Sequence, residues 1–122
     1  MQIDLEIIKP QGPPDYNTLI LKISILNKFD KHIAEQFELF CYTLIRGGIK
    51  KFIFDLKDLK YIDSSGIGKI INIAKVLRQQ RGNIALSRVP QDIMDVFKLV
   101  KLDTFVKIFL SNEECINYLK LT

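Results

Sequence analysis

Strand-like and helical patterns alternate along this chain, and this alternation limits the fold more than any other feature. Strand patterns occur at residues 3–7, 19–25, 52–56, 83–89 and 105–109. Helical stripes of apolar residues occur at 33–44, 67–77, 93–100 and 116–119. The order β-β-α-β-α-β-α-β-α predicts a single-domain α/β fold with right-handed crossovers. We expect a mixed, mostly parallel β-sheet of about five strands with about four α-helices.

Local signals refine this arrangement. The first two strands are expected to pair antiparallel through a loop at residues 10–17, PQGPPDYN. Gly47 and Gly48 are expected to end the first helix. Ser111 followed by Glu114 predicts a capping box at the start of the last helix. The length suits one domain spanning residues 1–122.

Composition excludes several classes of protein. The chain shows no signal peptide and no apolar run of about 18 residues, so we expect a soluble cytoplasmic protein without a membrane span. Cys41 and Cys115 fall in predicted helices and are expected to be buried, reduced thiols. The net charge is +4, but its 14 lysines and 4 arginines are scattered and do not alternate with aromatic residues. Direct nucleic-acid binding is therefore not expected.

The stretch YIDSSGIG, residues 61–68, joins a predicted strand to a predicted helix and raises four interpretations, of which the first two are disfavoured. A serine hydrolase is disfavoured because G-x-S-x-G is missing and the only histidine, His32, is expected to be solvated. A phosphate cradle is disfavoured because no nucleotide-binding glycine motif is complete and Asp63 would repel a phosphate. No enzyme activity, cofactor or metal is expected.

Two further interpretations of the serines are compatible with each other. Ser64 suits the N-cap of the helix, while Gly66 and Gly68 allow the strand and helix to pass closely. The hydroxyl would also be accessible to a kinase, and phosphorylation would add about −1.5 to −2 charges. A helix N-terminus tolerates this charge, whereas a partner docked beside Asp63 would not. The site therefore suits a binding switch.

The segment FIFDLKDLKYIDSSGIGKIINIAK resembles the core of the STAS domain, as found in bacterial anti-sigma factor antagonists. That family carries D-S-S-G-[LI]-G after a hydrophobic strand, which matches residues 63–68 here, and the resemblance extends over about residues 3–119. It implies that Ser64 is the phosphoacceptor. It also implies that Asp30 lines the partner surface, although helix capping is an equal alternative. Asn27 replaces a glycine that the family usually has before this aspartate.

The resemblance implies a regulatory protein-binding module in transcription control. Unphosphorylated protein would bind an anti-sigma factor with serine kinase activity and so release a sigma factor. Phosphorylation of Ser64 would switch this binding off, and a metal-dependent serine phosphatase would restore it. A STAS scaffold or regulatory subunit of a larger signalling or transport assembly is the alternative, followed by a nucleotide-binding protein. Weak homodimerisation is left open.

The expected partner surface extends from the motif onto the following helix. Val76 is expected to project away from the core stripe, on the same side as Lys69, with Ile73 between that side and the core. Ser65 should lie one step into the helix, with its hydroxyl bound to the backbone. The full predicted surface comprises Asp30, Asp63, Ser64, Ser65, Gly66, Lys69, Ile73 and Val76.

Overall fold

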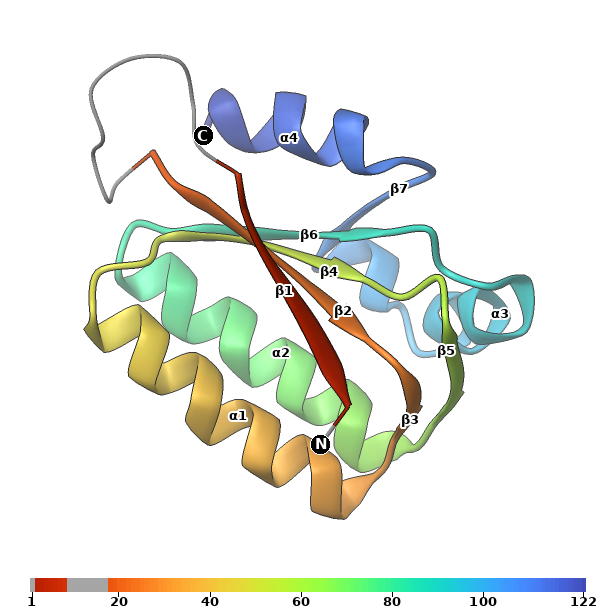
Figure 1. Ribbon diagram of the computed structural model, residues 1–122. Helices are drawn as coiled ribbons and strands as arrows, with labels where there is room; N and C mark the ends of the chain where they lie inside the picture. The colour runs from red at the N-terminus through yellow and green to blue at the C-terminus, as the bar shows by residue number, and fades with distance from the viewer. Residues whose placement is uncertain (1, 9–17) are drawn as a thin grey trace.

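The computed structural model describes residues 2–8 and 18–122 (Figure 1). The loop predicted at residues 10–17 lies outside these described residues. The elements are β1 Ile3–Ile8, β2 Ile20–Ile25, β3 Asn27–Phe29, α1 Lys31–Arg46, β4 Lys51–Asp55, β5 Leu59–Ile62, α2 Ser64–Gln79, β6 Asn83–Ser87, α3 Gln91–Leu99, a 3₁₀ turn η1 Leu102–Thr104, β7 Lys107–Phe109 and α4 Asn112–Lys120. The predicted order of the main elements is confirmed.

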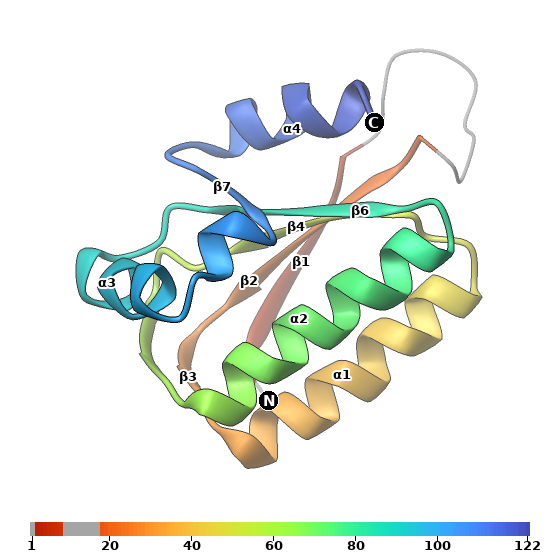
Figure 2. The same ribbon diagram turned by 180° about the vertical axis from the view of Figure 1, so that it is seen from behind.

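A five-stranded sheet in the order β1-β2-β4-β6-β7 forms the centre of the fold. β1 pairs antiparallel with β2, and the remaining neighbours pair in parallel. Helices α1 and α2 lie side by side against one face, and α4 lies against the other (Figures 1 and 2). The predicted mixed, mostly parallel α/β architecture is therefore confirmed.

The two faces of the sheet bury cores of different size. The larger core lies beneath α1 and α2, where the rings of Phe29, Phe37 and Phe54 pack edge to face with centroids 5.1 and 5.2 Å apart. The smaller core lies beneath α4 and consists of Ile20, Ile53, Ala85, Cys115 and Leu119. Every residue of β4 is buried because helices cover both of its faces, as its apolar run predicts.

Two short strands are absent from the sequence-based prediction. β3 and β5 pair in parallel as a separate two-stranded sheet, with an irregularity in register between Asn27 and Lys28. The last strand is also shorter than predicted. The N–H groups of Phe105 and Val106 both donate to the Leu102 carbonyl oxygen at 2.9 Å, at the end of the 3₁₀ turn η1, so β7 begins only at Lys107. Runs of three or four residues are too short to show a hydrophobic period, so pairing alone defines them.

The predicted thiols and caps can be compared directly with the structure. Cys41 and Cys115 are both free and buried, as expected. The Ser111 side chain accepts a hydrogen bond from the backbone N–H of Glu114 at 3.2 Å, which confirms the N-cap of α4. Gly47 forms the C-cap of α1, as expected.

Candidate functional site

The small β3–β5 sheet brings the starts of α1 and α2 together. Phe29 at the end of β3 pairs with Ile62 at the end of β5, so the residues that follow emerge at the same edge. Those residues are Asp30 and Asp63, which precede α1 and α2 respectively. The two aspartates consequently line one shallow hollow of about 370 Å³ at the paired helix N-termini.

Both aspartates cap the helix that follows them. Asp30 Oδ1 accepts a hydrogen bond from the Ile33 N–H at 3.1 Å, and Asp63 Oδ1 accepts one from the Gly66 N–H at 3.0 Å. The bond from Ile33 lowers the pKa of Asp30, and burial opposes this shift only in part. The expectation that Ser64 is the N-cap of α2 is therefore wrong, because Asp63 holds that position and Ser64 is the first helical residue.

Asp63 also links the two helices. Its second carboxylate oxygen, Oδ2, accepts a hydrogen bond from the Lys31 N–H in the first turn of α1 at 3.1 Å. A single side chain thus satisfies free N–H groups at two helix N-termini. Asp63 fixes the strand-to-helix turn against α1 and holds the adjacent Ser64 in place. His32, in the same turn of α1, is exposed, as predicted.

The two serines differ in exposure but share a free hydroxyl. Ser64 is exposed and Ser65 is half-buried. Among the residues that the structure describes, neither hydroxyl has a hydrogen-bond partner. The expectation that the Ser65 hydroxyl is bound to the backbone is therefore wrong. Exposure alone distinguishes the two serines, and it favours Ser64 as the residue that another protein can reach.

The two motif glycines have different roles. A Cβ added at Gly66 would lie 2.4 Å from the Phe29 carbonyl oxygen and 2.8 Å from its ring, so this position requires glycine. A Cβ added at Gly68 would meet nothing within 4 Å. Close passage of strand and helix is therefore confirmed at Gly66 and wrong at Gly68.

The predicted surface on α2 mostly faces α1. Lys69 forms an ion pair with Glu38 of α1, with Nζ and Oε1 3.0 Å apart. Ile73 is fully buried, so the expectation that it can contact a docked partner is wrong. Val76 is half-buried against the core and lines a hollow with Tyr42 of α1. The apolar stripe of a helix predicts only which residues are buried against the sheet. In the structure α1 also covers a second side of α2.

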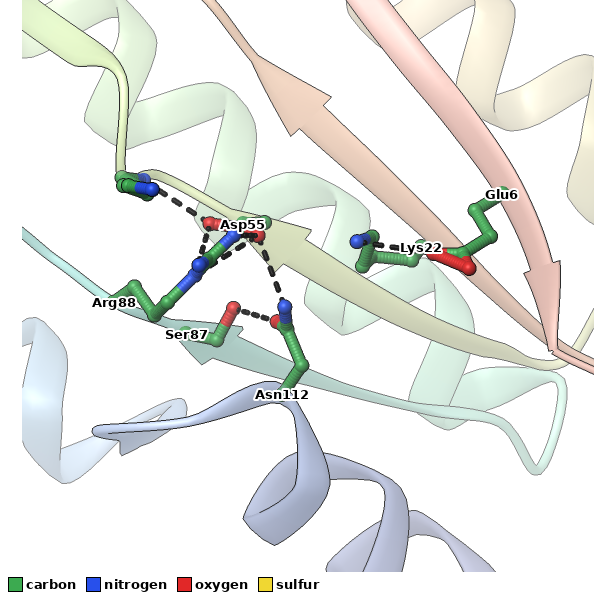
Figure 3. A network of polar contacts seen from close by, with 7 residues as sticks. Glu6, Lys22, Asp55, Ser87, Arg88 and Asn112 are labelled. Carbon is green, nitrogen blue, oxygen red and sulfur yellow. Dashed lines mark hydrogen bonds and ion pairs between the residues drawn. The ribbon is translucent and has the colours of Figure 1, made fainter.

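The sequence analysis did not predict a buried polar network that lies at the ends of β4 and β6 (Figure 3). Asp55 is 1% exposed. Its carboxylate accepts a hydrogen bond from Arg88 Nε at 3.2 Å and another from Asn112 Nδ2 at 3.1 Å. Oδ1 also accepts one from the Lys57 N–H at 3.1 Å, and the Ser87 hydroxyl bonds to Asn112 Oδ1.

This network is a structural feature with all its polar groups satisfied. Burial raises the pKa of Asp55, but the hydrogen bonds from Arg88 and Asn112 outweigh burial and hold it below its usual range. Throughout residues 2–8 and 18–122, no buried side-chain nitrogen or oxygen lacks a partner. A signal was available in the sequence, because an aspartate in a fully covered strand needs a partner of opposite charge.

Asp30 and Asp63 do not belong to a cluster of metal ligands among the described residues. In the described part of the chain, no group of three or more His, Cys, Asp or Glu side chains could hold a metal ion. What the paired helix N-termini offer instead is a free, exposed hydroxyl fixed beside two carboxylates.

Comparisons with known proteins agree with this arrangement. The chain is 30% identical over 89 residues to a Thermotoga maritima protein provisionally named an anti-sigma factor antagonist, covering 73% of each chain. It is 32% identical over 66 residues to BtrV of Bordetella bronchiseptica, which carries the same provisional name. That match covers 54% of this chain and only 57% of BtrV, so the chain spans little more than half of that relative.

Solved structures show the same fold. The chain is similar to the phosphorylated form of the Bacillus protein SpoIIAA, with a TM-score of 0.69 and 21% identity over 96% of this chain and 98% of that one. A crystal structure from Thermotoga maritima gives a TM-score of 0.79 at 23% identity, covering 95% and 94%. The family model of the STAS domain matches residues 10–115. The chain belongs to the STAS domain family.

Proposed function

We propose that this chain is an anti-sigma factor antagonist. In its unphosphorylated form it binds an anti-sigma factor with serine kinase activity and releases a sigma factor, and phosphorylation of Ser64 ends that binding. The observation that carries this proposal is the exposed, unbonded hydroxyl of Ser64 beside the capping carboxylate of Asp63. Relatives named as anti-sigma factor antagonists support it, as does the likeness to SpoIIAA, a protein solved in a phosphorylated form.

Electrostatics gives the switch its direction. A phosphoryl group on Ser64 would add about −1.5 to −2 charges at the N-terminal end of α2, where the helix dipole stabilises negative charge. The free domain therefore keeps its fold. A bound partner would have to desolvate that charge next to Asp63 and Asp30, and an unpaired buried charge is strongly unfavourable.

The proposed partner surface follows from exposure at the paired helix N-termini. It centres on Ser64 and includes Asp30, Asp63, Ser65 and the exposed part of Lys69. Val76 lies at the far end of α2, towards the C-terminal end of α1, and could contribute only to a partner that extends that far. Ile73 is excluded because it is buried.

The remaining parts of the proposal concern the protein's setting. Residues 1–122 act as one STAS domain in the cytoplasm, where the protein is a substrate for a partner kinase and a serine phosphatase and contributes no catalytic group or cofactor. It exerts its effect on transcription through protein binding and not through direct contact with nucleic acid. Within the described residues, no helix is long and apolar enough to cross a membrane.

Identification of the partner, followed by mapping of the phosphate, tests this function. Tagged Ser64→Ala protein should trap the partner kinase in lysate of the native cell, since this variant cannot be switched off. The purified kinase with ATP should then phosphorylate wild-type protein and Ser65→Ala protein on Ser64, as peptide mass mapping would show. Label on Ser65, or label that persists in Ser64→Ala, would contradict the assignment. Capture of a transport or scaffold assembly without a kinase would favour the alternative role.

A further inference from the structure

Strand β1 forms an open edge of the main sheet. It is the first strand in the sheet order, and β2 is its only partner in the part of the chain that the structure describes. Leu5 is 52% exposed and Ile7 is 60% exposed on this strand. An edge strand with exposed apolar residues is a template for pairing with another chain.

The backbone groups of Leu5 and Ile7 point away from β2. The Leu26 N–H donates to the Gln2 carbonyl oxygen at 3.1 Å, and the register of the two strands makes these residues directly opposite each other. In an antiparallel pair, opposite residues alternate between bonded and non-bonded pairs. The even-numbered residues of β1 therefore bond to β2, and the N–H and C=O groups of Leu5 and Ile7 face the open edge.

The side chains of β1 divide by chemistry between the two faces of the strand. Leu5 and Ile7 line an apolar hollow of about 410 Å³ together with Leu44 at the C-terminal end of α1 and Ile49 beyond it. Asp4 and Glu6 are exposed on the opposite face, where Glu6 Oε2 lies 3.0 Å from Lys22 Nζ (Figure 3).

The charge of this edge contrasts with the charge of the whole chain. Residues 2–8 carry two carboxylates and no lysine or arginine, in a protein of net charge +4. A cation of an incoming strand placed opposite Asp4 would be favourable, and a carboxylate in the same place would be unfavourable.

We propose that the β1 edge binds an extended segment of a partner protein, in which apolar residues alternate with basic ones. The backbone of the segment bonds to Leu5 and Ile7, its apolar side chains enter the hollow beside Leu44, and its basic side chains lie opposite Asp4 and Glu6. This surface is separate from Ser64, because the hollow lies at the C-terminal end of α1 and Ser64 lies beside its N-terminal end. The two partners could therefore bind together.

A second copy of this chain is the less favourable occupant. If two β1 strands paired antiparallel with Leu5 opposite Leu5, Asp4 of each copy would face Glu6 of the other. Like charges placed directly opposite each other destabilise a strand pair. The charge pattern of β1 therefore selects against self-pairing while it favours a basic segment.

The test uses three synthetic peptides of the same length with the full-length protein. In the first peptide lysine alternates with valine, in the second glutamate replaces lysine, and in the third the residues of the first are reordered without alternation. The alternating lysine peptide should bind at least about tenfold more tightly than either control in low-salt calorimetry. Backbone amide exchange by NMR should slow at Leu5 and Ile7 on binding, while the even-numbered amides of β1 are protected already.

Two variants separate strand addition from other modes of binding. Leu5→Pro removes an N–H that faces the open edge, so β1–β2 pairing should survive while peptide binding falls at least about tenfold. Asp4→Lys acts through charge alone and should remove most of the preference for the lysine peptide over the glutamate peptide. If a thermal melt shows that Leu5→Pro is unfolded, the peptide preference of Asp4→Lys tests the proposal in its place.

Several results would overturn the proposal. One is equal affinity of the wild type for the lysine and glutamate peptides. Another is slowed amide exchange that is confined to residues away from β1, and a third is the absence of binding at millimolar peptide. Protection of Leu5 and Ile7 in a dimer of the protein alone would instead make the second copy the occupant. Because the β1 edge is separate from Ser64, the affinity for the lysine peptide should also be unchanged in Ser64→Asp. This expectation does not depend on whether Ser64 is phosphorylated in the cell.

Discussion

Two aspartates at strand ends have opposite environments in this molecule. Asp55 ends β4, is 1% exposed, and accepts hydrogen bonds from Arg88, Asn112 and a backbone N–H. Asp63 follows β5 and is half-buried, and among the described residues its side chain bonds only to backbone N–H groups of two helices. The neighbour of Asp63, Ser64, has an exposed hydroxyl without a partner in the described structure.

The difference separates a site that maintains the fold from a site that can change state. A new charge near Asp55 would disturb bonds that hold β4, β6 and α4 together, because all its neighbours are already paired. A new charge on Ser64 disturbs no side-chain hydrogen bond among the residues that the structure describes, and it lies at a favourable helix end. Position at the carboxyl end of a strand is thus insufficient to mark a functional site.

The largest effect on stability is expected at Asp55. Asp55→Ala would leave Asn112 and the partly exposed Arg88 without their acceptor and should cost about 2–4 kcal/mol in the free energy of unfolding. Asp63→Ala removes a helix cap and should cost only about 1–2 kcal/mol. Urea unfolding of both variants measures the comparison. Equal losses would show that the two aspartates do not differ as burial suggests.

The two glycines of the motif sharpen the comparison within a single helix. Gly66→Ala forces a Cβ against the Phe29 carbonyl and should cost at least about 2 kcal/mol. Gly68→Ala meets open space within α2 and should stabilise the protein by about 0.5–1 kcal/mol. Thermal melts would detect the opposite signs. If Gly66→Ala lost little stability, β3 and the start of α2 could move apart at little cost in free energy.

Substitution of Ser64 should change binding and leave stability nearly unchanged. Because Asp63 is the cap, Ser64→Ala should alter the free energy of unfolding by less than about 0.5 kcal/mol. Ser64→Asp should fold normally yet bind the partner kinase at least tenfold more weakly, which corresponds to about 1.4 kcal/mol. Calorimetry with a non-hydrolysable nucleotide checks the affinity. A folded Ser64→Asp that binds as the wild type does would refute the switch.

The smallest effect is expected in the dependence of stability on pH. The folded-state pKa of Asp55 lies below its usual value near 4, so its stabilisation is present above about pH 4. That stabilisation is lost as the pH falls through the folded-state pKa. Asp55→Asn should therefore flatten the acid side of the stability curve, measured by urea midpoints between about pH 3 and about pH 7. An unchanged slope would assign acid sensitivity to other carboxyl groups.

The sequence predicts most of the fold because its signals there are long and local. The apolar stripe at residues 33–44 extends through most of the 16-residue helix α1, and the apolar run of β4 shows a strand covered on both faces. β3 and β5 were missed because three- and four-residue strands depend on pairing between distant segments. The Asp55–Arg88 contact was missed for a related reason, since 33 residues separate its partners.

The candidate site shows the same limits at finer resolution. The motif places Asp63 and Ser64 correctly at a strand-to-helix turn, but both residues suit an N-cap and only the backbone geometry decides between them. The burial of Ile73 depends on how α1 packs against α2, which the hydrophobic period of one helix does not contain. Sequence therefore locates the site, and tertiary packing determines which of its residues are accessible.

The position of α4 on the second face of the sheet has a consequence for cysteine reactivity. α4 rests on the small Ile53 core, and the Lys51 ammonium donates to the Leu119 carbonyl oxygen at 2.7 Å. Both thiols are buried, and burial raises the pKa of Cys115 to about 12 and that of Cys41 further still, so we expect neither to react with a thiol reagent while the protein is folded. If α4 detached transiently, Cys115 alone would be exposed, whereas Cys41 would become accessible only on opening of the larger core. The labelling rates of the two cysteines would therefore report separately on the opening of each face of the sheet.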